Sequence, residues 1–248
     1  MQTCQQKLND GEPVVSHSEE LARMVQAGAQ ALREGDIPRA LGLFEKVIEA
    51  FPDRPEGHNN LGALYASLGE FARAEACFDR VLQLIPDSGN ILYNRGLVRA
   101  RQENFDSARL DFEAVLALNP LDPDAHNNLG VAAYVRGDVE EARTHFTAAL
   151  ATHRTHPNAA INLCDLEAAA GDIPRAVATC RTFLERSGHP EIRRKLVDVA
   201  TAGAVEYLDL AIGVLESLIQ EESEDRKLRQ TLGRLITARS ALQGNTPL

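Results

Sequence analysis

A 34-residue internal repeat is the feature that most constrains how this chain of 248 residues can fold. The string HNNLG occurs at 58–62 and again at 126–130, and GDIPRA occurs at 35–40 and again at 171–176. The two shifts, 68 and 136 residues, are both multiples of 34. At that period five units follow one another without insertion or deletion, at 21–54, 55–88, 89–122, 123–156 and 157–190. Such a period indicates stacked supersecondary units rather than a globule around one core.

Small residues recur at two positions of each unit, and a large apolar residue recurs at a third. The eighth position holds Gly28, Gly62, Gly96, Gly130 and Cys164. The twentieth is Ala in all five units, and the twenty-fourth holds Phe44, Phe78, Phe112, Phe146 and Cys180. Small side chains let two helices approach closely, and the large one fills the space beside them. The fifteenth position is Gly in four units and is mostly followed by a short polar residue. This predicts the end of one helix and the cap of the next.

The second unit carries the most complete set of recurring residues, namely Leu61, Gly62, Tyr65, Ala74, Phe78 and Pro86. In this spacing they resemble the tetratricopeptide repeat family. The resemblance covers residues 21–190 and implies an all-α fold, a right-handed superhelical α-solenoid of helix-turn-helix hairpins, that binds other proteins. The third unit departs from the family pattern, with Arg95 and Arg99 in place of the Leu and the Tyr. The fifth unit departs from it as well, with Cys164 and Cys180 in place of the Gly and the Phe.

Composition agrees with an all-α chain. Aromatic residues make up 5%, Trp is absent, and Ala and Leu dominate, so the residues that favour strands are scarce. The formal net charge of -10 gives the chain no overall attraction to nucleic acid or to an anionic membrane. No stretch approaches the ~20 apolar residues that a membrane span needs. Four scattered Cys without CxxC spacing do not make a disulfide framework, so a reducing compartment and a cytoplasmic protein are predicted.

The sequence on either side of the five units is predicted to be less regular. Residues 1–18 are polar and are expected to form a flexible tail. Residues 191–222 keep helical patterning and are expected to form a degenerate sixth hairpin. A last amphipathic helix over 224–243 is expected to cap the solenoid with its polar face outward. The alternative is that this helix docks against a partner or against a second copy of the chain.

Signatures of catalysis and of cofactor binding are missing from the sequence. It has no Walker loop, no strand-associated GxGxxG, no HExxH and no CxxC, so no enzyme activity, cofactor or metal is expected. His145, His153 and His156 lie close in sequence but lack a matching carboxylate or thiolate that would complete a metal site. Cys164 and Cys180 occupy facing positions of one hairpin, where two buried apolar fillers are a commoner outcome than a redox pair.

The sixth position points to a binding surface, because it holds Gln26, Asn60, Asn94, Asn128 and Asn162. Asn is a poor helix former, about 0.5 to 0.7 kcal/mol worse than Ala, so four in line require a reason. The family resemblance implies that this position and positions 2, 5, 9, 12 and 13 line a concave groove. Each carboxamide could pair with the C=O and the N–H of an extended peptide. The column thus resembles the asparagine ladder of O-linked N-acetylglucosamine transferases. The alternative is that the asparagines serve local polar packing.

Further predicted partner-binding residues at groove positions are Asn59, Asn127, Tyr93, Tyr134 and Arg101. The tyrosines would supply apolar anchors with a polar tip, unless they belong to the core. Arg95, Arg99 and Arg101 are expected to receive a carboxylate from the partner. The alternative is that Arg95 and Arg99 extend their charged heads past an apolar seam. The Lys that chaperone-binding members of the family use in a carboxylate clamp is absent from position 5.

The predicted function is that of a non-catalytic scaffold or adaptor, which binds an extended segment of a partner protein in the concave groove. One alternative is a self-assembling platform, in which the tail or an exposed hairpin of one copy occupies the groove of the next. Another is a module that recruits a separately encoded glycosyltransferase or methyltransferase. The predicted partner is therefore a protein or peptide, with a homo-oligomer as the alternative and with neither nucleic acid nor a membrane span.

Overall fold

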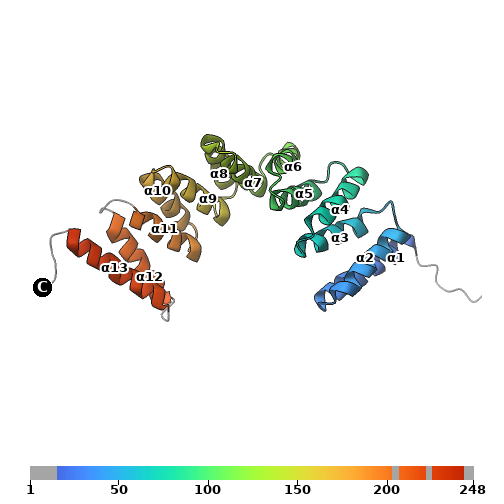
Figure 1. Cartoon of the computed structure of the whole chain (residues 1–248), viewed down its shortest axis with the longest axis horizontal. Helices are drawn as coiled ribbons and strands as arrows, with labels where there is room; N and C mark the ends of the chain where they lie inside the picture. Colours follow the sequence, from blue (N-terminus) through green and yellow to red (C-terminus); the bar gives the residue numbers. More distant parts are fainter. Residues whose placement is uncertain (1–15, 203–206, 222–224, 243–248) are drawn as a thin grey trace, which may run out of the picture. The chain divides into compact units, whose positions relative to one another are not determined.

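The computed structural model describes residues 16–202, 207–221 and 225–242, and within these ranges it contains thirteen α-helices and no β-strand (Figure 1). The all-α fold class predicted from the sequence is therefore confirmed. The predicted tail falls largely on residues 1–15, which lie outside the described ranges. None of the described helices is both long enough and apolar enough to cross a membrane.

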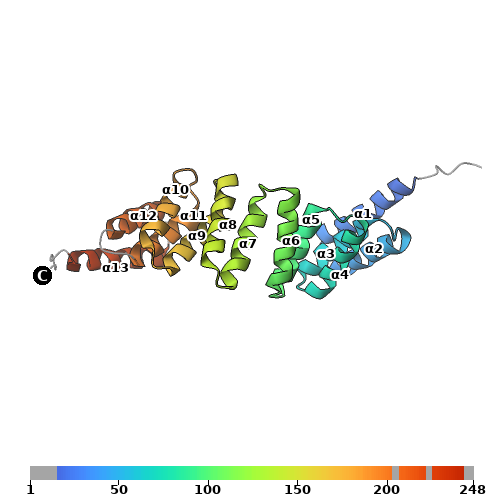
Figure 2. The ribbon, with the colours of Figure 1, turned by 90° about the horizontal axis from the view of Figure 1, so that it is seen from above.

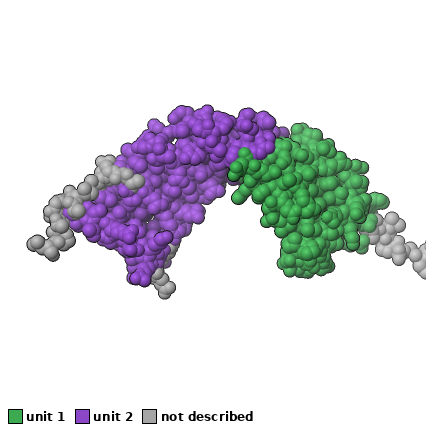
Figure 3. Space-filling view, viewed as in Figure 1, with its two compact units in different colours: residues 1–103 green, residues 104–248 purple. Residues whose placement is uncertain are grey.

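The chain divides into two compact units, residues 1–103 and 104–248 (Figure 3). The first unit contains α1 (His17–Arg33), α2 (Ile37–Ala50), α3 (Pro55–Ser67), α4 (Phe71–Leu84) and α5 (Gly89–Arg101). The second unit contains α6 (Phe105–Leu118), α7 (Pro123–Val135), α8 (Val139–Thr152), α9 (Pro157–Ala169), α10 (Ile173–Leu184), α11 (Pro190–Ala202), α12 (Leu208–Glu221) and α13 (Arg226–Leu242). Helices α3, α5, α7 and α9 all have 13 residues, and their starts are 34 residues apart, as the repeat requires.

A residue in the left-handed conformation follows the first helix of each repeat. Its φ lies between 77° and 84° at Gly35, Gly69, Gly137 and Gly171, where glycine avoids the steric cost of a Cβ. Glu103 takes the same place in the third repeat, with a φ of 60°. The next residue caps the second helix in four of the repeats by accepting a hydrogen bond from the backbone N–H three residues later; these caps are Asp36, Asn104, Asp138 and Asp172.

A glycine of the first helix and a phenylalanine of the second form the seam of the hairpin in three repeats. The rings of Phe44, Phe78 and Phe146 are buried. A Cβ added at Gly28 would lie 2.5 Å from Phe44 Cε1, and one added at Gly130 would lie 2.5 Å from Phe146 Cε1. The eighth position is therefore Gly because the ring occupies the space that any side chain would need.

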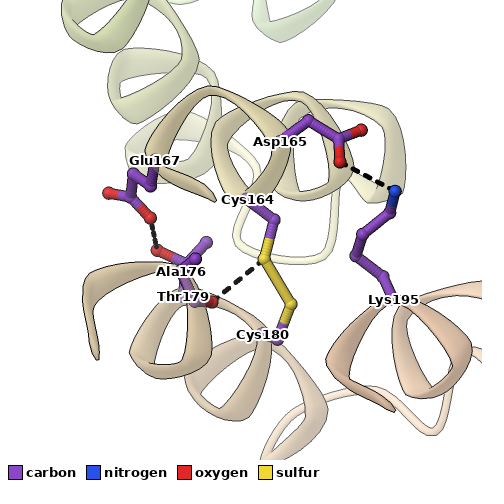
Figure 4. The surroundings of a disulfide bond; sticks show 7 residues. All are labelled: Cys164, Asp165, Glu167, Ala176, Thr179, Cys180 and Lys195. Atoms are coloured by element: carbon purple, nitrogen blue, oxygen red, sulfur yellow. Dashed lines mark hydrogen bonds and ion pairs between the residues drawn. A yellow bond between two sulfur atoms is a disulfide. The ribbon is translucent and has the colours of Figure 1, made fainter. Parts of the chain in front are cut away.

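The fifth repeat closes the same seam covalently, by a disulfide between Cys164 of α9 and Cys180 of α10, whose Cα atoms are 6.7 Å apart (Figure 4). Both side chains are fully buried. The sequence favoured two separate apolar fillers, and the structure corrects this. Since the seam has a short side chain on each helix and no ring between them, the two sulfur atoms face each other within bonding range.

The C-terminal helices continue the stacking. Helix α11 packs on α10 and α12, and α13 packs on α12 (Figures 1 and 2). The apolar side of α13 packs against a small core of α11 and α12, through Leu228, Leu232 and Leu235. Arg239, on the same helix, reaches Asp209 of α12 at 2.9 Å. The last helix thus covers apolar surface of the second unit.

Candidate functional site

Two adjoining hollows lie between α3 and α5 in the first unit. One has a volume of about 550 Å³, and we name it the Asn59 hollow; it is lined by Pro55, Glu56, Asn59, Val81, Ile85, Ser88, Asn90, Ile91, Tyr93 and Asn94. The other has a volume of about 420 Å³, and we name it the Arg101 hollow; it is lined by Ala63, Ala66, Ser67, Gly69, Phe71, Phe78, Asn94, Leu97, Val98 and Arg101. The two hollows share Asn94, and we call their joint surface the first-unit groove.

Most of the residues that α3 and α5 contribute come from the positions that the family resemblance assigned to a concave surface. Positions three and four residues apart fall on one face of a helix, so each helix presents them on one side. Four of the predicted partner-binding residues are brought together in this way: Asn59, Tyr93, Asn94 and Arg101. The groove is therefore formed mainly by helix residues at fixed positions of the repeat rather than by an irregular loop.

Asn94 is the central residue of the groove, because it lines both hollows. Its side chain is half-buried, and none of the described residues forms a hydrogen bond with it. One acceptor and two donors are thus available to a ligand. Asn60, the preceding member of the predicted column, is different, since its Nδ2 donates to the carbonyl of Glu56 at 2.7 Å.

The asparagines of the second unit are engaged within the protein. Asn128 Nδ2 donates to the carbonyl of Asp124 at 2.8 Å. Asn162 Nδ2 donates to Oδ1 of Asn127 at 2.9 Å, which joins α9 to α7. Asn127 itself is only 8% exposed, because it lies where these two helices meet, so the structure buries this predicted partner-binding residue. The structure therefore does not present the column as four equivalent rungs.

The two predicted tyrosine anchors lie in different units. Tyr93 lines the Asn59 hollow and also has a partner within the protein. Tyr134 is close to the end of α7 in the second unit and is 48% exposed. Neither ring is among the buried residues, whereas Tyr65 is. Tyr93 is thus the tyrosine that can contribute to the first-unit groove.

Basic side chains of α5 are bound to carboxylates of α4. Arg95 Nη1 lies 2.7 Å from Asp79 Oδ1, and Arg99 Nε lies 2.8 Å from Glu75 Oε1. Burial alone would raise the pKa of Glu75, but hydrogen bonds from Arg99 and Gln102 lower it below its ordinary value. The interpretation that these guanidinium groups receive a partner's carboxylate is corrected, because α4 supplies their counter-charges. The interpretation that the side chains extend past an apolar seam stays a prediction.

The remaining charges of the groove lie at its two ends. Glu56 in the Asn59 hollow is paired with Arg54, whose Nη2 lies 2.6 Å from Glu56 Oε1. The hydrogen bond from Arg54 lowers the pKa of Glu56, against the opposing effect of burial. Arg101, at the other end, is exposed. Between the two ends the groove offers amides, a hydroxyl and alkyl groups, so it is close to neutral.

Sequence reasoning missed the apolar floor of the Asn59 hollow. Val81 and Ile85 come from α4 and the residue that follows it, and Ile91 comes from α5. Ile85 is 46% exposed, so part of this apolar floor is open to solvent. The repeat positions predicted a groove lined only by the first helix of each repeat. Because the floor forms only where three helices meet, no single position of the repeat signals it.

The groove can bind, but its groups are poorly suited to chemistry. Its polar atoms belong to amides, to the hydroxyls of two serines, to the tyrosine phenol and to the charged side chains of Glu56 and Arg101. The carboxylate of Glu56, the only one that lines the two hollows, is paired with Arg54. Within the described residues, no three or more His, Cys, Asp or Glu side chains are grouped so as to hold a metal ion.

Comparison with known families and structures identifies the repeat. A family model described as tetratricopeptide repeat matches residues 26–89 and 93–160, and a second with the same description matches residues 136–197. A search among curated protein sequences found no significant match. The fold is similar to that of PilW, described as a widely conserved type IV pilus biogenesis factor, with 19% identity, 86% of this chain and 99% of that chain covered, and a TM-score of 0.69.

Two further solved structures show the same fold. MamA from Desulfovibrio magneticus RS-1 is 23% identical over 67% of this chain and 94% of that chain, with a TM-score of 0.62. YrrB, described as a TPR protein with an unusual peptide-binding site, is 18% identical over 71% of this chain and 91% of that chain, with a TM-score of 0.58. At sequence identities this low, the similarity shows a shared fold and nothing about function.

Proposed function

This chain belongs to the tetratricopeptide repeat family, and we propose that it is a non-catalytic interaction scaffold that binds an extended segment of a partner protein in the first-unit groove. The observation that carries the proposal is the carboxamide of Asn94, which lines both hollows and has no hydrogen-bond partner among the described residues. The acceptor and the two donors of this amide can pair with a ligand. The description of YrrB as a peptide-binding protein lends the proposal support by analogy.

The two hollows suit a peptide in an extended conformation. Asn94 would pair with its backbone, since one carboxamide can accept from an N–H and donate to a C=O. An apolar side chain of the peptide would enter the Asn59 hollow against Ile85 and Ile91, which lie at its floor. Each hydrogen bond contributes about 0.5 to 1.5 kcal/mol net, and ordering the peptide offsets part of this gain. Moderate affinity is therefore expected.

The experiment starts from a library of random 12-residue peptides displayed on phage and selected against the whole protein. The best peptide is synthesised with a fluorescent label, and its affinity is measured by anisotropy for the wild type, Asn94→Ala and Asn128→Ala. We expect Asn94→Ala to weaken binding about 5- to 10-fold, because two hydrogen bonds are lost. Asn128→Ala removes the same group from the same repeat position in the second unit, so it should leave the affinity unchanged.

Two results would contradict the proposal. In one, the selection yields no peptide that binds the protein with a dissociation constant below about 1 mM. In the other, both variants bind the selected peptide as the wild type does, or Asn128→Ala is the more damaging. Circular dichroism melting of each variant checks that helicity is retained. Light scattering of the protein with and without residues 1–15 tests the alternative, in which the groove binds another copy of the chain.

A further inference from the structure

A third hollow, which we name the arginine hollow, lies in the second unit between α8 and α10. Its volume is about 240 Å³. Its apolar walls are Leu150 of α8, Leu163 of α9, and Ala178 and Phe183 of α10. The hollow is smaller than the ~300 Å³ at which small-molecule sites begin, so it has room for one side chain rather than for a whole cofactor.

Three arginines surround these apolar walls: Arg154, Arg175 and Arg186. No acidic residue is among the residues that line the hollow. Such a concentration of positive charge is unexpected in a chain whose net charge is -10. All three side chains are exposed, so the hollow presents an apolar centre within a cationic rim.

The positive charge of this rim is largely uncompensated within the protein. Arg175 Nη1 lies 3.6 Å from Asp172 Oδ2, but both side chains are exposed and such pairs contribute little. Among the described residues no carboxylate lies within 4.0 Å of Arg154 or Arg186. This contrasts with Arg95 and Arg99 of the first unit, which are bound to carboxylates of α4.

One buried carboxylate lies near the hollow, and both of its oxygens already have partners within the protein. Glu167 of α9 is 3% exposed and accepts a hydrogen bond from the hydroxyl of Thr179 at 2.8 Å (Figure 4). Its other oxygen lies 3.5 Å from Arg143 Nη1. Because Thr179 also lines the hollow, Glu167 holds one side of the wall in place. Burial raises the pKa of Glu167, and the charges of Arg143 and Arg175 oppose this effect, so Arg175 is the rim arginine on which the carboxylate acts.

The disulfide fixes the two helices that carry most of the wall. Cys164 directly follows Leu163 on α9, and Cys180 directly follows Thr179 on α10. The covalent link ties α9 to α10 beside these two wall residues. Figure 4 shows the bond together with Thr179. A site that is rigid before binding loses less entropy when its ligand arrives.

We propose that the arginine hollow is a second binding site, separate from the first-unit groove, which takes an acidic peptide segment with one apolar side chain flanked by carboxylates. The apolar side chain would enter the hollow, and the carboxylates would pair with Arg154 and Arg186, for which arginine is the preferred partner. A nucleic acid fits less well, because phosphates gain nothing from an apolar centre and the overall charge of -10 repels a long polyanion.

The test uses a defined probe, a fluorescein-labelled peptide of sequence Gly-Asp-Glu-Phe-Glu-Asp-Gly, and the full chain. Its affinity is measured by anisotropy for the wild type, for the double variant Arg154→Gln/Arg186→Gln and for Arg181→Gln. Arg181 is an exposed arginine of α10 that does not line the hollow, so it serves as the control. We expect the double variant to bind about 10-fold more weakly, while Arg181→Gln binds as the wild type does.

Two altered probes separate the contributions of charge and shape. A peptide with Asn and Gln in place of Asp and Glu should bind at least about 10-fold more weakly, and so should one with Ala in place of Phe.

The proposal is overturned if the acidic peptide does not bind the wild type at about 1 mM, or if Arg181→Gln weakens binding as much as the double variant. It is equally overturned if a single-stranded oligonucleotide binds more tightly than the peptide and is displaced by it. Asn94→Ala should bind this probe normally, so failure here is distinct from failure of the first-unit groove.

Discussion

The two units use one repeat in different ways. In the first unit, Asn94 lines the groove between α3 and α5 and has no hydrogen-bond partner among the described residues. In the second unit, the equivalent Asn128 and Asn162 donate to protein groups of α7. Asn94 is thus available to a ligand, whereas Asn60 of the same unit, like Asn128 and Asn162 of the second unit, already donates a hydrogen bond within the protein. A periodic sequence is therefore no guarantee of a periodic binding surface.

Two pairs of arginines, one pair in each unit, differ in the opposite sense. Arg95 and Arg99 of the first unit are bound to carboxylates of α4, whereas Arg154 and Arg186 of the second have no such partner among the described residues. If both proposals hold, the first unit offers an amide to a peptide backbone, and the second offers cations to acidic side chains. The comparison predicts two ligands of different chemistry on one chain.

The largest expected difference between the units is their response to a reductant. The disulfide closes a loop with a sequence separation of 16 residues, for which its removal costs about 3 kcal/mol. Hydrogen exchange measured in urea, with and without a phosphine reductant, reports on each helix. The reductant should speed exchange in α9 and α10 and leave exchange in α1 to α4 unchanged.

A matched variant sharpens this prediction. Cys164→Gly/Cys180→Phe restores the residues that other repeats have at the seam, so its stability should no longer depend on the reductant. Equal protection of α9 with and without reductant in the wild type would contradict the account. The disulfide also removes the main reason for predicting a reducing compartment, since structural disulfides persist chiefly in oxidising ones.

The second effect concerns the seam that the two units have in common. Gly130→Ala would place a Cβ 2.5 Å from the buried ring of Phe146, and such overpacking costs about 1 to 3 kcal/mol. Gly28→Ala makes the same contact with Phe44 in the first unit and should cost a similar amount. Gly42→Ala is the control, because no atom lies within 4 Å of its added Cβ and a mid-helix alanine gains about 0.5 to 1 kcal/mol. Equal melting temperatures for all three variants would refute this packing.

A smaller and opposite effect is expected at the end of the first unit. Glu103 has a φ of 60° where four other repeats have glycine. Since a side chain in the left-handed region costs about 1 to 2 kcal/mol, Glu103→Gly should stabilise the protein by about 1 kcal/mol. Chemical denaturation measures the change, and Gly69→Glu, the reverse substitution in the second repeat, should destabilise it. A destabilising Glu103→Gly would contradict this assignment.

The smallest expected effect is a dependence on pH. Burial, followed by the charge of His126 3.2 Å away, lowers the pKa of His145 in the second unit. The folded state then binds this proton less readily than the unfolded state, whose pKa is about 6.5. The stability that His145 contributes as a neutral group is therefore fully present above the unfolded-state pKa. It is lost as the pH falls from there toward the lower pKa of the folded state. Burial shifts His58 of the first unit in the same direction.

The contribution of His145 can be isolated with the variant His145→Gln. Urea unfolding between about pH 7.5 and pH 5.5 should show a shallower loss of stability for this variant than for the wild type. A steeper loss, or an identical one, would show that the protonated imidazolium of His145 is not destabilised in the folded state. Acidic groups titrate in both proteins and cancel in the difference.

Much of the fold could be predicted from the sequence, because its determinants are local and recur. The glycines of the turns, the aspartates that cap the next helix and the Gly–Phe seam each act within one hairpin, and the structure confirms them. The candidate site could be predicted less fully. Which amide is free depends on rotamers and on neighbours in other helices, as Asn162 and Asn127 illustrate.

The arginine hollow had no signal in the sequence for a related reason. Arg154, Arg175 and Arg186 occupy three different positions of the repeat, so no column of the register collects them. Only the packing of α10 beside α8 and α9 brings them around one hollow. Sites of this kind are set by tertiary contacts rather than by periodicity.

The central claim, that the repeat offers its backbone-binding amide in the first unit alone, is tested most directly by hydrogen exchange of the wild type with and without the selected 12-residue peptide. The account predicts that bound peptide slows exchange in α3, α5 and the end of α4, with no change in α7 and α9. Protection confined to α7 and α9 would contradict it, and so would equal protection of the first helices in both units.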